Sequence, residues 1–212
     1  MVSFDDVDIY PVTALNLFEA GSDMEVIAAL AAGGAKIVQL REKNVTSREL
    51  YNLALIYRRE TSSHGMLLII NDRLDLAASV GAVGVHLGQS DLPIYVARSI
   101  LGPHAIIGGS SHSVEEALQV QAEGATYVNI GPIFETPTKP GMRAVGLDPV
   151  REAVGRLSIP FTVMGGIDQS NIASVAAAGA EKIGVVRAIF GDKDMAEATR
   201  RLRKAMGAKG AA

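Results

Sequence analysis

Short apolar runs alternate with longer amphipathic stretches along almost the whole chain. The runs are rich in β-branched residues, and most are continuously apolar, which is typical of strands covered on both faces in a parallel sheet. The pattern predicts eight strands, over residues 9–14, 36–40, 66–70, 84–87, 105–109, 127–130, 161–164 and 182–186.

The stretches between these runs carry helix signals. Thr46 and Glu49 have the spacing of a capping box at a helix start, and Ser113 and Glu116 repeat the device. Glycine commonly ends a helix in the left-handed conformation. Four dipeptides have that position between a predicted helix and the next strand, namely Gly34-Ala35, Gly81-Ala82, Gly124-Ala125 and Gly179-Ala180.

Eight strand–helix units without a linker imply either a closed barrel or an open doubly wound sheet. Eight strands close comfortably, and 212 residues lie at the short end of the usual barrel length. We therefore expect an α/β fold with a single (β/α)8 TIM barrel. One domain would cover residues 1–212, with a short flexible tail at 207–212.

Composition narrows the range of functions. With 48% hydrophobic residues the chain can form a substantial core, and the lack of cysteine excludes disulfides, thiolate catalysis and Cys-ligated zinc. We expect a cytoplasmic protein, since a cysteine-free chain suits a reducing compartment and residues 1–8 lack a signal-peptide pattern. A net charge of −3 and the lack of a long apolar run argue against nucleic acid and membrane as partners. Small-molecule substrates remain, and barrels of this kind often pair, which leaves a homo-oligomer open.

Polar residues follow seven consecutive predicted strands at the point where each strand ends. In a barrel the chemistry sits at this rim, because the strand ends and the loops after them converge there. The convergence, rather than any single residue, indicates an active site. The polar clusters are residues 39–43, 71–72, 88–91, 108–112, 131–141, 165–167 and 186–187.

Asp72 and Asp91 each precede a predicted helix, where an aspartate ordinarily serves as an N-cap. They also lie at neighbouring strand ends, where both can bind one hard cation. Mg²⁺ takes one or two carboxylates and fills its shell with waters and phosphate oxygens. We therefore expect Mg²⁺ as the cofactor, with capping as the alternative for each aspartate.

Two further groups of residues suit phosphate. Arg41 and Lys43 are two residues apart and face the same side of an extended strand, although a surface ion-pair cluster is the alternative. Thr136, Thr138 and Lys139 fall in one short run after the sixth strand, as in a phosphate-binding lid.

The ends of the last two strands predict a separate phosphate site. Gly165-Gly166 and Val186-Arg187 follow them, where backbone N–H groups bind an anion and glycine permits a close approach. The residues thus predict a metal-assisted site for a diphosphate and an amide site for a monophosphate. We interpret His86 as a packed barrel histidine and leave the role of His112 open.

The rim motifs together resemble one enzyme family. They are Gln39-Leu40-Arg41-Glu42-Lys43, Asn71-Asp72, His86-Leu87-Gly88-Gln89 with Asp91, Gly108-Gly109-Ser110-Ser111-His112, Gly131-Pro132-Ile133-Phe134 with Thr136-Pro137-Thr138-Lys139, and Gly165-Gly166-Ile167. In this order and spacing, over roughly residues 10–189, the chain resembles the thiamine-phosphate synthases. The resemblance implies that a pyrimidine diphosphate ionises and that the nitrogen of a thiazole phosphate, or of its carboxylate, captures the cation.

The resemblance also implies a role for each matched residue. Gln39, Leu40, Arg41, Glu42, Lys43, Asn71, Ser110 and Lys139 would bind the pyrimidine diphosphate, with Mg²⁺ between Asp72 and Asp91. Thr136, Pro137, Thr138, Gly166, Val186 and Arg187 would bind the thiazole phosphate. The catalytic set would be Arg41, Lys43, Lys139 and Ser110. Two positions depart from the family pattern, since Arg187 replaces a small residue and Ala14 an aspartate.

Three other functions stay open at this point. A thiazole tautomerase would need an acid–base residue such as His112, but it would not need Asp72, Asp91 and Lys139 together. A catalytically silent paralogue would bind thiamine intermediates without turnover. A sugar-phosphate isomerase or epimerase would use a carboxylate at the rim as a proton shuttle.

Overall fold

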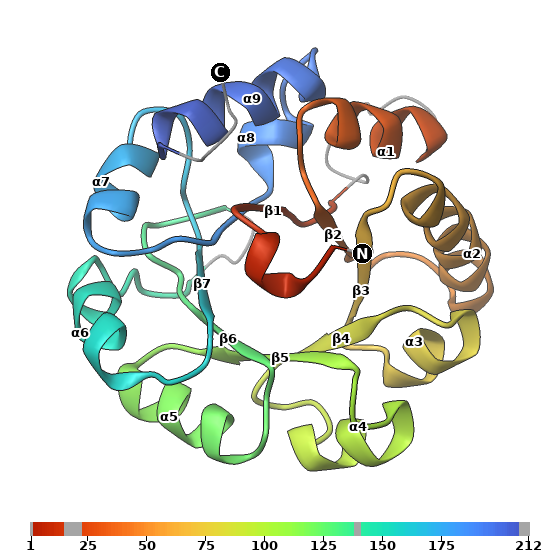
Figure 1. Cartoon of the computed structure of the whole chain (residues 1–212), viewed down its shortest axis with the longest axis horizontal. Coiled ribbons are helices and arrows are strands. Elements are labelled where there is room, and N and C mark those ends of the chain that lie inside the picture. Colours follow the sequence, from red (N-terminus) through yellow and green to blue (C-terminus); the bar gives the residue numbers. More distant parts are fainter. Residues whose placement is uncertain (1, 15–22, 138–140, 208–212) are drawn as a thin grey trace.

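The computed structural model describes residues 2–14, 23–137 and 141–207, and its strands form one parallel sheet around a central axis (Figure 1). The strands are β1 Ile9–Pro11, β2 Ile37–Leu40, β3 Leu67–Asn71, β4 Gly84–Leu87, β5 Ile106–Ser111, β6 Tyr127–Ile130, β7 Phe161–Met164 and β8 Ile183–Val185. Their order in the sheet is β1-β8-β7-β6-β5-β4-β3-β2, and a parallel bridge between Val12 and Gln39 joins its two edges. The predicted barrel is confirmed, with strand ends within a few residues of those expected.

Helices surround the barrel (Figure 1). They are α1 Asp23–Ala32, α2 Ser47–Ser63, α3 Leu74–Val80, α4 Ile94–Leu101, α5 Val114–Ala122, α6 Asp148–Arg156, α7 Ile172–Ala177, α8 Arg187–Phe190 and α9 Met195–Ala205. None of these helices is long and apolar enough to cross a membrane. The predicted tail falls outside the described residues from position 208 onward.

The helix signals of the sequence are confirmed with one exception. Thr46 and Glu49 form the capping box of α2. At α5 the Ser113 hydroxyl accepts a hydrogen bond from the Glu116 backbone, but the Glu116 carboxylate accepts from the backbone N–H of His112. The second capping box is therefore only half formed. The predicted glycines all have positive φ, at Gly34, Gly81, Gly124 and Gly179.

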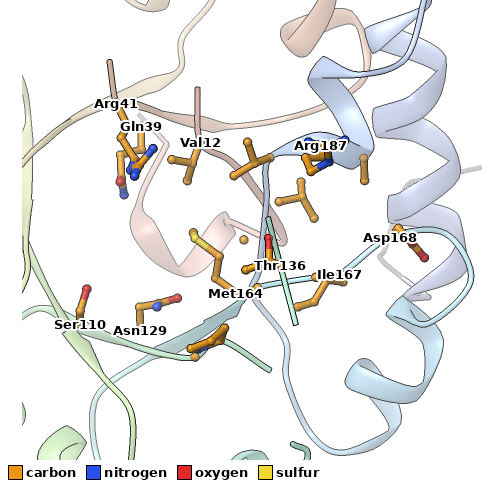
Figure 2. A pocket seen from close by; sticks show the side chains of 18 of the residues that line it. Val12, Gln39, Arg41, Ser110, Asn129, Thr136, Met164, Ile167, Asp168 and Arg187 are labelled. Carbon is orange, nitrogen blue, oxygen red and sulfur yellow. The ribbon is translucent and has the colours of Figure 1, made fainter. Parts of the chain in front are cut away.

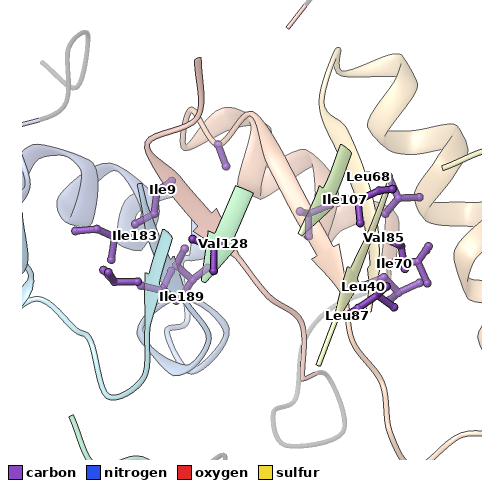
Figure 3. Close-up of a cluster of buried hydrophobic side chains, with 14 of the residues drawn as sticks. Ile9, Leu40, Leu68, Ile70, Val85, Leu87, Ile107, Val128, Ile183 and Ile189 are labelled. Carbon is purple, nitrogen blue, oxygen red and sulfur yellow. The ribbon is translucent and has the colours of Figure 1, made fainter. Parts of the chain in front are cut away.

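Both faces of the sheet are buried, which explains the continuously apolar strands. Side chains alternate along each strand, so that Val38 and Leu40 pack towards the helices whereas Ile37 lies inside the barrel. The outer layer is the larger cluster (Figure 3). Inside the barrel, apolar residues fill the part near the amino ends of the strands. Polar groups lie at the carboxyl ends of the strands.

The N-terminal segment closes one end of the barrel. A 3₁₀ helix, η1 (Phe4–Asp6), lies across the barrel centre (Figure 1), and the Phe4 ring stacks on Tyr127 with centroids 4.3 Å apart. Lys182 Nζ donates hydrogen bonds to the backbone carbonyls of Asp5 and Val7, at 2.9 and 3.0 Å. The opposite end, where the strands terminate, is left for ligands.

An ion pair joins the segment before β1 to α9. Arg203 on α9 donates through Nε and Nη2 to Asp8 Oδ2, at 3.0 and 2.8 Å, and the arginine is buried. A Cβ atom at Gly34 would lie 2.1 Å from Arg203 Nη1. A side chain at this position would displace the Arg203 guanidinium, and the φ of +88° itself favours glycine.

Candidate active site

A pocket of about 280 Å³ opens at the carboxyl ends of the strands (Figure 2). Its lining includes Gln39, Arg41, Asn71, Ser110, Thr136, Pro137, Gly166, Val186 and Arg187, all predicted from the sequence. Figure 2 shows Gln39 and Arg41 at one side of the pocket and Arg187 across from them. The pocket therefore has cationic groups at two separate places.

Hydrogen bonds donated by backbone N–H groups hold the end of β2 against the segment that follows β1. The Arg41 N–H donates to Thr13 Oγ1 at 2.9 Å, and the Thr13 N–H donates to the Gln39 carbonyl at 2.9 Å. Leu40 and Glu42 lie outside the pocket lining: Leu40 packs in the outer core, and the Glu42 carboxylate accepts from Thr13 Oγ1 at 2.6 Å. Side chains alternate from Gln39 to Arg41, so these two line the pocket, whereas Lys43 further along the chain lies outside the lining.

Asp72 and Asp91 lie beside the pocket, together with Lys43. Lys43 Nζ is 3.6 Å from Asp72 Oδ2, and Asp91 Oδ2 accepts from the Gly88 N–H at 2.6 Å. Burial is the main cause that raises the pKa of Asp72; the neighbouring Asp91 raises it further, and Lys43 acts in the opposite direction. Two carboxylates thus share one partly buried space.

The capping interpretation of these two aspartates is wrong. The N-cap positions of α3 and α4 are Arg73 and Pro93, and neither has a side-chain cap. Asp72 instead has a φ of +60°, which residues other than glycine rarely adopt. This backbone conformation sets the direction of the Asp72 side chain towards Asp91.

The aspartate pair fits a hard divalent cation. Within the described residues, no group of three or more His, Cys, Asp or Glu side chains could hold a metal ion. Mg²⁺ does not require such a cage, because one or two carboxylates suffice when waters and phosphate oxygens complete its octahedron. Asp72 and Asp91 supply that number of ligands, and the cation would relieve the repulsion between them.

The loop after β6 packs tightly on the end of β7. Ile133 and Phe134 donate backbone hydrogen bonds to the carbonyls of Met164 and Gly165, at 2.9 and 3.0 Å. Gly166 has a φ of +63°, and a Cβ atom there would lie 2.6 Å from the Glu135 carbonyl oxygen. Packing against this loop therefore requires glycine at 166. From the sequence, this glycine was linked only to the close approach of a phosphate to the backbone.

The remaining predicted residues of this side are only partly described. Thr136 and Pro137 line the pocket, whereas Thr138 and Lys139 lie outside the described residues. Arg187 is the first residue of the short helix α8 and lines the pocket. The other departure from the family pattern, Ala14, is buried.

Several lining residues were not predicted as site residues. His86 is packed as expected, with 7% of its surface exposed, yet it also lines the pocket. Asn129 lines the pocket as well, and its Oδ1 accepts from Thr162 Oγ1 at 3.0 Å. A lone amide within an apolar buried strand is the signal that could have identified Asn129.

His112, whose role was open, lines the pocket beside Glu116. Its backbone N–H donates to Glu116 Oε2 at 2.7 Å, and its Nδ1 lies 3.0 Å from the same oxygen. The carboxylate therefore fixes the imidazole at the start of α5. An imidazole held in this way is able to serve as an acid or a base.

The chain is similar to several known proteins. A family model described as thiamine monophosphate synthase matches residues 9–189. The thiamine-phosphate synthase of Gloeobacter violaceus is 47% identical over 176 residues, which are 83% of this chain but only 52% of that relative, so the chain spans about half its length. The thiamine-phosphate synthase of Chloroflexus aurantiacus is 44% identical over 199 residues, which cover 93% of this chain and 92% of the relative. The solved thiamine phosphate pyrophosphorylase from Pyrococcus furiosus has a TM-score of 0.86 and 36% identity, over 95% of this chain and 96% of the other.

Proposed function

This chain belongs to the thiamine monophosphate synthase family, and from that premise we propose that it joins a pyrimidine diphosphate to a thiazole phosphate. The products are thiamine phosphate and pyrophosphate. The observation that carries the proposal is that Arg41, which lines the pocket, lies near Lys43 and the Asp72–Asp91 pair just outside the lining. This grouping suits a diphosphate leaving group, whereas a ligand with a single phosphate would not need all four residues.

The two substrates occupy the two sides of the pocket. We place the pyrimidine diphosphate against Gln39, Arg41, Asn71 and Ser110, with Lys43 and Lys139 at its phosphates. Leu40 and Glu42 do not line the pocket, so we give their side chains no contact with this substrate. We place the thiazole phosphate against Thr136, Pro137, Thr138, Gly166, Val186 and Arg187, where the Arg187 guanidinium adds a charge to the backbone amides.

Asp72 and Asp91 would hold Mg²⁺. When bound, the ion would neutralise charge on the diphosphate oxygens and so make pyrophosphate a better leaving group. Its binding between the two carboxylates would also remove the like-charge repulsion that raises the pKa of Asp72.

The protein's cations act on the bond that breaks. The C–O bond between the pyrimidine methylene and the diphosphate breaks, and its electron pair leaves with pyrophosphate. Negative charge on that group grows as the bond stretches, so Arg41, Lys43 and Lys139 stabilise the transition state more than the ground state. The thiazole nitrogen lone pair then forms the new N–C bond. That nitrogen carries no proton, so the step needs no general base.

The tautomerase remains the nearest rival. The contact of His112 with Glu116 would supply its acid–base residue. That reaction, however, has no role for a diphosphate site, and it would leave Arg41 and the aspartate pair without a function. A catalytically silent paralogue is distinguished only by turnover. We also propose a cytoplasmic location, which suits a chain without cysteine.

The test is to incubate the purified protein with both substrates, with and without Mg²⁺, and to measure pyrophosphate and thiamine phosphate together. We expect the two products in equal amounts, and only with Mg²⁺. Isomerisation of the thiazole phosphate alone, with no pyrophosphate, would favour the tautomerase. Tight binding of either substrate with no turnover would favour the silent paralogue.

A further inference from the structure

A row of five hydrogen-bonded side chains crosses the barrel interior beneath the pocket. Gln39 Nε2 is 3.1 Å from Tyr10 Oη, and Tyr10 Oη is 2.9 Å from Tyr127 Oη. Tyr127 Oη is 2.9 Å from His86 Nδ1, and His86 Nε2 is 2.9 Å from Ser110 Oγ. Gln39, His86 and Ser110 line the pocket, whereas the two phenols lie below it and are at most 1% exposed. The proposed reaction gives the tyrosines and His86 no part.

The Gln39 amide, with Nε2 towards Tyr10, sets the direction of this row. The Gln39 amide donates to Tyr10 Oη, so the single hydrogen of Tyr10 is the one that bonds to Tyr127. The hydrogen of Tyr127 is then left for His86 Nδ1. The opposite direction would leave the buried Tyr10 hydrogen with no acceptor in the row, which buried polar groups avoid. Burial raises the pKa of both phenols, so each keeps its hydrogen at neutral pH.

Because His86 Nδ1 accepts, its hydrogen is on Nε2 and is donated to Ser110 Oγ. The hydroxyl hydrogen of Ser110 then points to the pocket rather than back to the imidazole. A ligand group beside Ser110 therefore meets a donor. A ring nitrogen with a free lone pair matches this donor, whereas a ring N–H does not.

The place of Tyr127 is fixed by its neighbours. Its ring stacks on Phe4, and a Cβ atom at Gly108 on β5 would lie 2.1 Å from its ring. Gly108 stands opposite Tyr127 in the β5–β6 register and also opposite His86 in the β4–β5 register. Glycine at this position thus makes the room in which the phenol reaches the imidazole.

We propose that His86, held as the Nε2–H tautomer by Tyr127 and Tyr10, is a positioning residue that presents Ser110 as a hydrogen-bond donor to a ring nitrogen of the pyrimidine. The tautomer follows from the row together with the orientation of the Gln39 amide. The identity of the acceptor rests on the proposed function.

The tautomer is tested in the unaltered protein without substrates. The chain has four histidines, and ¹⁵N labelling of histidine with long-range ¹H–¹⁵N correlation distinguishes a protonated Nε2 from a protonated Nδ1. A His86→Gln spectrum identifies the signal of His86. We expect a neutral ring with Nδ1 unprotonated at neutral pH. A ring with its hydrogen on Nδ1 would reverse the row and overturn the proposal, whatever the outcome of the activity test.

A double-mutant cycle tests the positioning role. We expect Tyr127→Phe to lower kcat/KM for the pyrimidine diphosphate about tenfold, which corresponds to the loss of roughly one hydrogen bond. In a Ser110→Ala background the same change should have almost no further effect, because the hydroxyl that it positions is gone. Equal losses in both backgrounds would show a purely structural role and overturn the proposal.

A matched control is available in Tyr57. Its hydroxyl is buried and has no hydrogen-bond partner among the described residues, and it does not line the pocket. Tyr57→Phe therefore removes the same atom without touching the row and should leave kcat/KM within twofold. If Tyr127→Phe fails to fold, the tautomer in the unaltered protein decides the question.

Discussion

Lys43 Nζ lies 3.6 Å from Asp72 Oδ2, while Asp91 faces the same carboxylate. Two acidic groups thus lie together at the ends of β3 and β4. Lys43 and, more weakly, Arg41 lower the pKa of Asp72, but burial and Asp91 outweigh them. The pair retains negative charge in a partly buried space, which is unfavourable for the folded protein. The stability and the activity of the protein should therefore respond in opposite directions when this charge is removed.

We expect Asp72→Asn to lower turnover by roughly two orders of magnitude, as the loss of a metal ligand at the leaving group would. Asparagine is chosen because it tolerates the positive φ of Asp72 better than alanine. Without metal, the variant should melt at a higher temperature than the parent, and Mg²⁺ should no longer raise that temperature. Asp75→Asn, which changes an exposed carboxylate on α3, is the control for both measurements. Full activity at limiting Mg²⁺ would refute the metal assignment.

The same pair predicts a pH dependence of stability without metal. The pKa of Asp72 is raised in the folded protein, so its contribution is fully present below the unfolded pKa of about 3.9 and is lost as pH rises through the folded pKa. The stabilising effect of Asp72→Asn should therefore be larger at neutral than at acid pH. Denaturant unfolding of both proteins at several pH values measures the difference. An effect independent of pH would contradict this account.

We expect Arg41→Lys to lower kcat/KM for the pyrimidine diphosphate by about ten- to a hundredfold. Lysine keeps the charge but lacks the planar fork that binds two phosphate oxygens at once. Arg151→Lys is the matched control, because Arg151 is an exposed arginine on α6 whose ion pair with Asp148 lies away from the pocket. Steady-state kinetics of both variants suffice. An unchanged kcat/KM for Arg41→Lys would remove Arg41 from the site.

Gly166→Ala should destabilise the fold as well as weaken binding of the thiazole phosphate. The new Cβ would meet the Glu135 carbonyl at 2.6 Å and would force the β6 loop away, so we expect a loss of about 3 kcal/mol in the free energy of unfolding. Gly81→Ala separates the two causes. Gly81 has a φ of +65° but open space around it, so the loss there should be only about 1 kcal/mol. Equal losses at the two positions would exclude the contact with the loop.

His112→Asn should leave the rate of thiamine phosphate formation within a few-fold of the parent. The proposed reaction moves no proton, so an imidazole at the pocket rim has no acid–base step to perform. A tautomerase would instead lose most of its activity, which makes this variant a test between the two functions. The thermal unfolding temperature serves as the control, because the contact with Glu116 also supports the start of α5.

Much of the barrel was predictable because its strands are buried on both faces. Continuous apolar runs located all eight strands, and the alternation of residues places Arg41 on the opposite side from Leu40 and Glu42. Applied strictly, that alternation excludes the side chains of Leu40 and Glu42 from the binding set on the sequence pattern alone.

The features that were missed depend on contacts across strands. The left-handed backbone of Asp72 has no signal in its own sequence, since an aspartate before a helix ordinarily predicts a cap. Tyr10 and Tyr127 count only as apolar strand residues in the sequence, because periodicity does not say where a phenol hydrogen points. The sequence links the Gly166 backbone to phosphate, whereas the nearest neighbour of a Cβ there is the Glu135 carbonyl.

The ion pair between Asp8 and Arg203 joins residues 195 positions apart in the chain, and β1 pairs with β8 beside it. During synthesis the ribosome delivers β1 well before β8 and α9. At a synthesis rate of about 5–20 residues per second, β1 remains without its partner β8 for roughly ten seconds or more. Pairings of such long sequence separation also form slowly. A truncated chain that lacks α9 should therefore be a target for chaperones and proteases, even though every residue lining the pocket is already present.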